Sequence, residues 1–186
     1  MTNTRKALSR RDLRRRHIED YSSLYNRVQL RLQDSLLRNT AKVTDERLGD
    51  VPDAGLIALY HNYGRYLLIS RSRHGLKAVP AIHQGDWNPS SDPRWGSKFA
   101  ININTQMKYW PTNIGNLPEC EAPLFNLLER VAERGEKTAR QIYGCSGWAV
   151  DYSTNIFTGT DPQNRWLPAT GKPASFLSTV LKLTFI

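Results

Sequence analysis

The 186-residue sequence has only two cysteines and no long apolar run. Cys120 and Cys145 are too few for a small protein held together by several disulfides. No stretch approaches the ~20 apolar residues that a membrane-spanning helix needs, so we expect no membrane span. The basic N-terminus is not followed by the apolar segment of a secretory signal, so none is expected in this chain, and the localisation stays open.

Motifs that bind nucleotides or metals are also missing. The sequence contains no GxxxxGK[ST] or GxGxxG loop, no HExxH or paired CxxC motif, and no GxSxG nucleophile turn. His61, His74 and His83 are scattered, and we interpret each as a structural or loop histidine. We therefore expect neither a cofactor nor a metal ion.

Acidic residues are scarce at the N-terminus, where most of the net charge of +9 resides. Residues 1–16 contain seven Lys and Arg side chains against Asp12 alone, which leaves +3 for the other 170 residues. We interpret residues 1–16 as a basic flexible arm, with a targeting or nucleic-acid-binding role as the alternative. The low charge of the remainder argues against nucleic acid as a partner.

The rest of the sequence has the periodicity of helices rather than strands. Apolar residues recur at spacings of three and four from His17 onward and again from about Asp53 to residues 73–75. Gly64 falls inside the second of these patterns, which predicts close packing or the approach of a ligand there. The sequence therefore belongs to the mostly α class.

The clearest helix is predicted over Glu121–Arg134. Pro123 suits its first turn and Gly135 is predicted to end it, with a shorter helix over Glu136–Tyr143 to follow. In all, we expect about five helices joined by long loops.

Those loops concentrate tryptophan, asparagine and other polar residues. Carbohydrate sites have this composition because aromatic faces cover the C–H patches of a sugar while amides bind its hydroxyls. The alternative is that the tryptophans are core residues with polar neighbours in tight turns. The candidate binding residues are Trp87, Asn88, Trp95, Asn102, Asn104 and Trp110.

Glycoside hydrolysis also requires two carboxyl groups on opposite sides of the scissile bond. Sequence spacing does not pair any of the candidates, which are Asp86, Glu119, Glu121, Asp151 and Asp161. Glu129 and Glu133 are predicted to form a solvated helix face instead.

A series of motifs in this region is specific enough to indicate a family. The longest is Asn102–Pro111, which reads NINTQMKYWP, and it follows Tyr63–Ile69, Gln84–Gly85 and Trp95–Ser97 in the expected order. From about Leu13 to Thr170 the chain resembles glycoside hydrolase family 95, the family of 1,2-α-L-fucosidases and related α-L-galactosidases.

The resemblance implies part of an (α/α)6 barrel and an inverting mechanism without a metal. It implies that a Glu acts as general acid and that paired asparagines, matched here by Asn102 and Asn104, position the attacking water together with an Asp. It also implies a fucosylated oligosaccharide or related glycan as partner. The substrate-binding residues would be Trp87, Asn88, Trp95, Trp110 and Thr154.

The sequence departs from the family pattern in three ways. Lys108 replaces the usual Asn of the QMNYW motif, and residues 151–155 keep only Thr154 of a His-His-Asn-Thr-Asp motif. The expected general acid would lie beyond Thr170, where the resemblance ends. We therefore expect residues 17–170 to be the N-terminal part of a glycosidase domain, residues 171–186 to be a divergent apolar tail, and the chain alone to be inactive, with a non-catalytic carbohydrate-binding remnant as the alternative.

Overall fold

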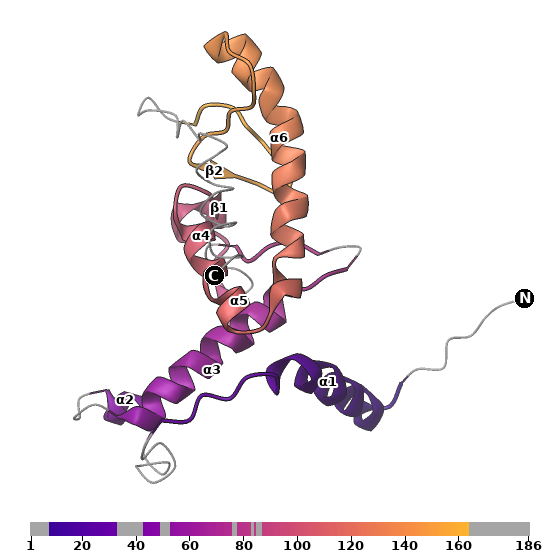
Figure 1. The fold of residues 1–186 in the computed structure, drawn as a ribbon, viewed down its shortest axis with the longest axis vertical. Helices are drawn as coiled ribbons and strands as arrows, with labels where there is room; N and C mark the ends of the chain where they lie inside the picture. The colour runs from indigo at the N-terminus through magenta and orange to yellow at the C-terminus, as the bar shows by residue number, and fades with distance from the viewer. Residues whose placement is uncertain are drawn as a thin grey trace, which may run out of the picture. The chain divides into compact units, whose positions relative to one another are not determined.

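A computed structural model of the protein describes residues 8–32, 43–48, 53–75, 78–82, 84 and 87–163. The chain divides into two compact units, residues 1–69 and 70–186. Both units are built mainly from helices, as Figure 1 shows, so the prediction of a mostly α protein is confirmed. The described residues form six α-helices where about five were expected, because two of them, α2 and α5, are single turns.

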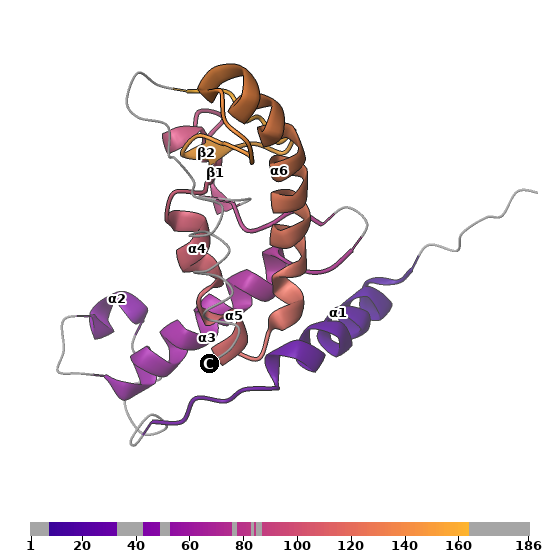
Figure 2. The same cartoon turned by 45° about the horizontal axis from the view of Figure 1, so that its top comes forward.

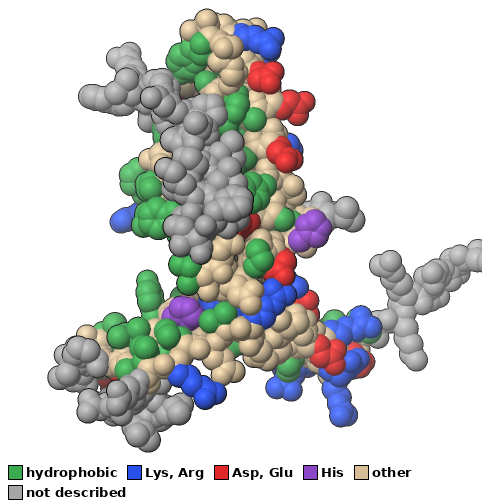
Figure 3. Space-filling model, viewed as in Figure 1, with side chains coloured by type: hydrophobic (Ala, Val, Ile, Leu, Met, Phe, Trp, Pro, Cys, Tyr) green, Lys and Arg blue, Asp and Glu red, His purple; other side chains and the backbone are tan. Residues whose placement is uncertain are grey.

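The first unit contains α1 (Arg10–Tyr25), α2 (Thr44–Arg47) and most of α3 (Ala54–Arg71). The Ser9 side chain caps α1 by accepting a hydrogen bond from the backbone N–H of Asp12 at 3.2 Å. The segment predicted as a flexible arm is therefore helical from Arg10 onward, and residues 1–7 lie outside the described residues. Lysine and arginine side chains cluster over α1 in Figure 3.

Helices α1 and α3 are joined by a buried arginine and by aromatic rings. The Arg65 guanidinium donates hydrogen bonds to the carbonyl oxygens of Tyr25, Val28 and Leu24 at 2.6, 3.1 and 3.0 Å. The ring of Tyr21 meets the ring of Tyr66 edge-on, with 6.2 Å between centroids. Because the last carbonyls of a helix lack a full set of partners within it, Arg65 supplies donors to the end of α1 and to the carbonyl of Val28 beyond it.

The start of α3 is fixed by Asp53. Its carboxylate pairs with Arg47 at 2.7 Å and accepts a hydrogen bond from the backbone N–H of Leu56 at 2.9 Å. The hydrogen bonds from Arg47 and from the backbone lower the pKa of Asp53 to about 2. Further along α3, a Cβ added at Gly64 would meet nothing within 4 Å, so the prediction of close packing there was wrong.

The second unit is organised around α6 (Ala122–Tyr143). Its other elements are the 3₁₀ turn η2 (Arg94–Ser97), β1 (Phe99–Ala100), α4 (Asn104–Tyr109), α5 (Pro111–Ile114), the 3₁₀ turn η3 (Pro118–Cys120) and β2 (Ser153–Thr154). Strands β1 and β2 pair antiparallel, with Phe99 opposite Thr154. Figure 2 shows α4 and this strand pair lying along α6, as they do in Figure 1.

Helix α6 is longer than predicted, because Gly135 does not end it. A Cβ at Gly135 would lie 2.7 Å from the carbonyl oxygen of Ala149, whose N–H donates to the Gly135 carbonyl at 3.0 Å. Glycine is required at this point because the chain after α6 crosses the helix closely. Gly144, at φ 62°, is the left-handed residue that ends the helix.

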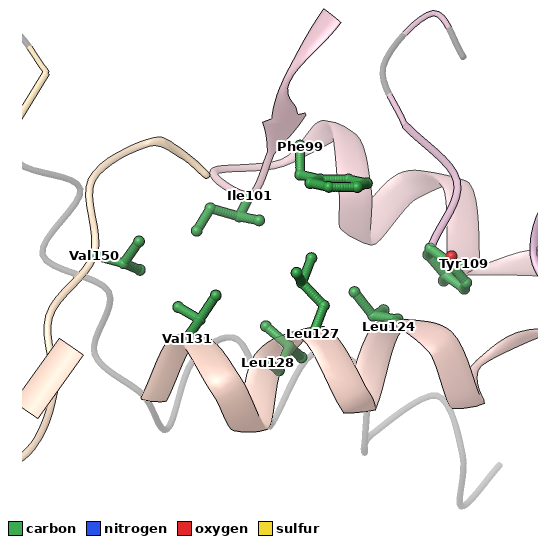
Figure 4. Packing of buried hydrophobic residues seen from close by; sticks show 8 residues of the cluster. All are labelled: Phe99, Ile101, Tyr109, Leu124, Leu127, Leu128, Val131 and Val150. Carbon is green, nitrogen blue, oxygen red and sulfur yellow. The ribbon is translucent and has the colours of Figure 1, made fainter. Parts of the chain in front are cut away.

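The core of the second unit lies between α6, α4 and β1. Figure 4 shows leucine and valine side chains of α6 facing Phe99, Ile101 and Tyr109. Glu129 and Glu133 lie on the exposed side of α6, as predicted, and acidic side chains follow this helix in Figure 3. The core thus holds the strand pair and the start of α4 in one place, where the candidate site lies.

Candidate functional site

The two asparagines lie where β1 passes into α4. The N–H of Ile101 donates to the carbonyl of Tyr152 at 2.9 Å, which fixes the chain immediately before Asn102. The Asn102 side-chain oxygen accepts the N–H of Ile103 at 3.0 Å, and Asn104 is the first residue of α4. Asn102 therefore stands in irregular backbone ahead of α4, and Asn104 begins the helix.

Both asparagines line one hollow of about 270 Å³ in the second unit. Its walls come from η2, from β1 and the residues around it, and from the start of β2. The described lining residues are Trp95, Lys98, Ala100, Asn102, Asn104, Tyr152 and Ser153. The hollow therefore combines an indole ring, two amides, two hydroxyl groups and an ammonium group, which is a suitable set for a sugar ring and its hydroxyls.

The turn that carries Trp95 has an unusual backbone. Trp95, Gly96 and Ser97 have φ values of 62°, 62° and 47°, although non-glycine residues rarely adopt positive φ. The indole is 77% exposed, so burial of the ring does not explain the conformation. Strained backbone of this kind concentrates at functional sites, because the fold must hold it against its intrinsic preference.

A network around Gln163 supports the opposite wall. The buried Asp151 carboxylate accepts the backbone N–H groups of Tyr152, at 2.7 Å, and of Gln163. Gln163 in turn donates to the Ser153 carbonyl and accepts from the Ser153 hydroxyl at 2.8 Å and from the Lys98 ammonium at 3.1 Å. The Asp151 carboxylate thus helps to position Gln163, and Gln163 in turn positions the lining residues Lys98 and Ser153.

The remaining predicted binding residues do not line the hollow. Trp87 and Trp110 are 52% and 38% exposed elsewhere on the second unit. The Asn88 side chain bonds to Gln84 and to the N–H of Ser90, which stabilises its own loop. Thr154 is 1% exposed and its hydroxyl donates to the Gly159 carbonyl at 2.9 Å. Their binding roles stay predictions, and the contacts of Asn88 and Thr154 are structural ones.

None of the candidate carboxylates that the structure describes lines this hollow. Glu121 is buried and accepts hydrogen bonds from the side chains of Thr112 and Asn113, and Glu119 is exposed on η3. Asp161 borders a different hollow of about 640 Å³ along α6, and Asp86 lies outside the described residues. The sequence alone could not separate these structural roles from catalytic ones.

Two further lining residues lie in the segment that departs from the family pattern. Tyr152 and Ser153 stand where the family pattern has its second His and its Asn, and both border the hollow. Lys98 had no signal in the sequence, because its place depends on β1 pairing with a strand more than fifty residues away. The described residues contain no cluster of three metal-ligating side chains and no helix long and apolar enough to cross a membrane.

Comparison with known proteins identifies the family of the chain. Residues 9–179 match the glycosyl hydrolase family 95 catalytic domain. The chain is 42% identical over 157 residues to "Alpha-L-fucosidase 2" of Arabidopsis thaliana, which covers 81% of this chain and 18% of that protein. It is 36% identical over 171 residues to "Probable alpha-fucosidase A" of Aspergillus oryzae, covering 84% of this chain and 22% of the relative.

The class of protein that this match defines is a family of glycosidases. The chain belongs to glycosyl hydrolase family 95. It spans about a fifth of the length of the curated relatives that it matches.

Proposed function

We propose that this chain supplies the water-positioning part of an inverting α-L-fucosidase site that acts on α-1,2-linked fucosyl glycans. The observation that supports the proposal is the hollow in which Asn102 and Asn104 stand beside the exposed indole of Trp95. The relatives are named as an α-L-fucosidase and a probable α-fucosidase, which supports fucose as the sugar.

The two amides are suited to hold a water molecule. The Asn102 side-chain oxygen uses one lone pair on the N–H of Ile103, and its amide nitrogen has no protein partner among the described residues. The Asn104 side chain is half-buried and likewise makes no hydrogen bond to another described residue. A carbonyl oxygen of each amide can accept a hydrogen from one water and so fix its orientation toward an anomeric carbon.

Amides cannot complete the reaction, because they take up no proton near neutral pH. Inversion needs one carboxylate to receive the proton of the water and one carboxylic acid to protonate the leaving oxygen. No carboxylate borders the hollow in the described part of the chain. We therefore propose that the chain alone binds the glycan without hydrolysing it.

Binding and hydrolysis test the two parts of the proposal separately. The chain 1–186 is titrated with a neutral oligosaccharide that ends in α-1,2-linked fucose, and binding is measured by isothermal titration calorimetry. Trp95→Ala should weaken binding about fivefold to tenfold, if stacking on a sugar contributes as much as the roughly 0.5–1.5 kcal/mol of an aromatic pair. Phe157→Ala, which removes another exposed aromatic side chain of the second unit, is the matched control and should have no effect.

The outcomes have distinct meanings. An absence of binding, or equal loss in both variants, would contradict the sugar site. Release of fucose by the purified chain would contradict the proposed inactivity, and would require an acid such as Glu119, Glu121 or Asp151 to act in solution.

A further inference from the structure

Lys98 is the charged residue of the hollow. The other described lining residues are Trp95, Ala100, Asn102, Asn104, Tyr152 and Ser153, all of them uncharged at neutral pH. The hollow is therefore cationic where a neutral sugar would need no charge. A binding site with one uncompensated charge favours a ligand that carries the opposite charge.

The Lys98 side chain is exposed, and a hydrogen bond orients its ammonium group at the hollow. Its stem lies over the strained turn, with Cε 3.6 Å and Cγ 3.7 Å from the position of a Cβ at Gly96. Its Nζ donates to the Gln163 side-chain oxygen at 3.1 Å, and Gln163 is itself bonded to Ser153. Of the three N–H donors of an ammonium, one is used and two have no partner among the described residues.

The carboxylate of Asp151, which directly precedes the lining residues Tyr152 and Ser153, does not neutralise the ammonium. Asp151 is 2% exposed and accepts the backbone N–H groups of Tyr152 and Gln163. No ion pair of Lys98 occurs in the described residues. The positive charge is thus available to a ligand that enters beside Trp95.

We propose that Lys98 selects glycans that carry an anionic substituent, a carboxylate or a sulfate ester, next to the sugar in this hollow. The inference rests on the proposed glycan-binding function and adds a substrate class to it. The ammonium would donate its remaining hydrogen bonds to the anionic oxygens, while Trp95 stacks on the ring.

The test uses three matched fucosylated oligosaccharides: a neutral one, its counterpart with a uronic acid, and its counterpart with a sulfate ester. Dissociation constants for chain 1–186 are measured at low and at high salt. We expect at least one acidic ligand to bind about fivefold tighter than the neutral one at low salt, a preference that salt reduces. The ligand that shows the preference identifies the anionic group.

Variants assign the preference to one side chain. Lys98→Met should bring the ratio of neutral to acidic dissociation constants to about one, and Lys98→Arg should keep it. The control is Lys137→Met, which removes a lysine from the other hollow, along α6, and should also keep the preference. Circular dichroism shows whether each variant is folded, and Lys98→Gln serves in place of the Met variant if that one is not.

Equal binding of all three ligands, or a preference that survives in Lys98→Met, would overturn the inference and leave the glycan site standing. Failure of every ligand to bind would overturn both. The two failures are therefore distinguishable.

Discussion

At the scale of single residues, the environment of Lys108 conflicts with its charge. Its Nζ is enclosed in the second unit and has no hydrogen-bond partner among the described residues. Burial lowers the pKa of Lys108 to about 8, because an ammonium is poorly solvated there. The family pattern has an uncharged Asn at this position. The sequence therefore showed Lys108 to be a departure from the family, but it did not indicate that the side chain is buried.

Replacing this lysine should stabilise the fold at neutral pH. Between about pH 8 and pH 10.5 the unfolded chain holds a proton that the folded chain releases, so stability rises with pH across that window. Lys108→Met removes this dependence and should raise the free energy of unfolding at pH 7 by about 1–3 kcal/mol. Urea denaturation at pH 7 and at pH 9.5 measures both effects.

The matched control is Lys137→Met on the exposed side of α6, which should leave the pH dependence of the parent chain unchanged. A Lys108→Met variant that is less stable at pH 7, or equally pH-dependent, would show that the amine has a partner that stabilises its charge.

The same scale shows what local sequence can and cannot specify about the site. Asn102, Asn104 and Trp95 were predicted as site residues from their types, and the structure brings them to one hollow. Asp151 looked like a possible catalytic acid, but its carboxylate is used by two backbone N–H groups. Whether a carboxylate is free or bonded depends on contacts that spacing along the chain does not reveal.

At the scale of elements, the glycines of α3 and α6 have opposite surroundings. Gly64 is exposed with open space around its Cβ position, whereas Gly135 faces the backbone of Ala149 at 2.7 Å. The sequence predicted close packing or the approach of a ligand at the first and a helix end at the second, and both the close packing and the helix end were wrong. The local sequence around the two glycines gives no sign of this difference. Gly135 is crowded only because residues 148–149 cross α6 there.

The two glycines should respond to alanine with opposite signs. Gly64→Ala should stabilise the chain by about 0.5–1 kcal/mol, because alanine is the better helix former and meets no clash. Gly135→Ala gains the same propensity but forces apart α6 and Ala149, and should destabilise the second unit by roughly 1–3 kcal/mol.

Thermal denaturation of the two variants beside the parent measures the difference in sign. If Gly135→Ala were as stabilising as Gly64→Ala, the close crossing of residue 149 over α6 would be contradicted.

At the scale of the whole molecule, the helical class followed from periodicity, but the division after residue 69 did not. That division depends on contacts between distant positions. Arg65 reaches carbonyls about forty residues earlier in the chain, and β1 pairs with β2 across more than fifty residues. Such contacts leave no periodic signal, because each end resembles an ordinary helix or loop residue.

The last prediction is that stability is local to each unit. Arg65→Met removes a buried guanidinium and leaves the carbonyls of Leu24, Tyr25 and Val28 without their donor, which costs about 2 kcal/mol or more. All of these groups lie in the first unit. Amide hydrogen exchange in α1 should therefore accelerate at least about tenfold, while amides of α6 keep the rates of the parent.

Arg15→Met, which removes only an exposed pair with Glu19, is the control and should change neither helix. Faster exchange in α6 as well would show instead that the two units unfold as one, because loss of a bond in the first would then be felt in the second.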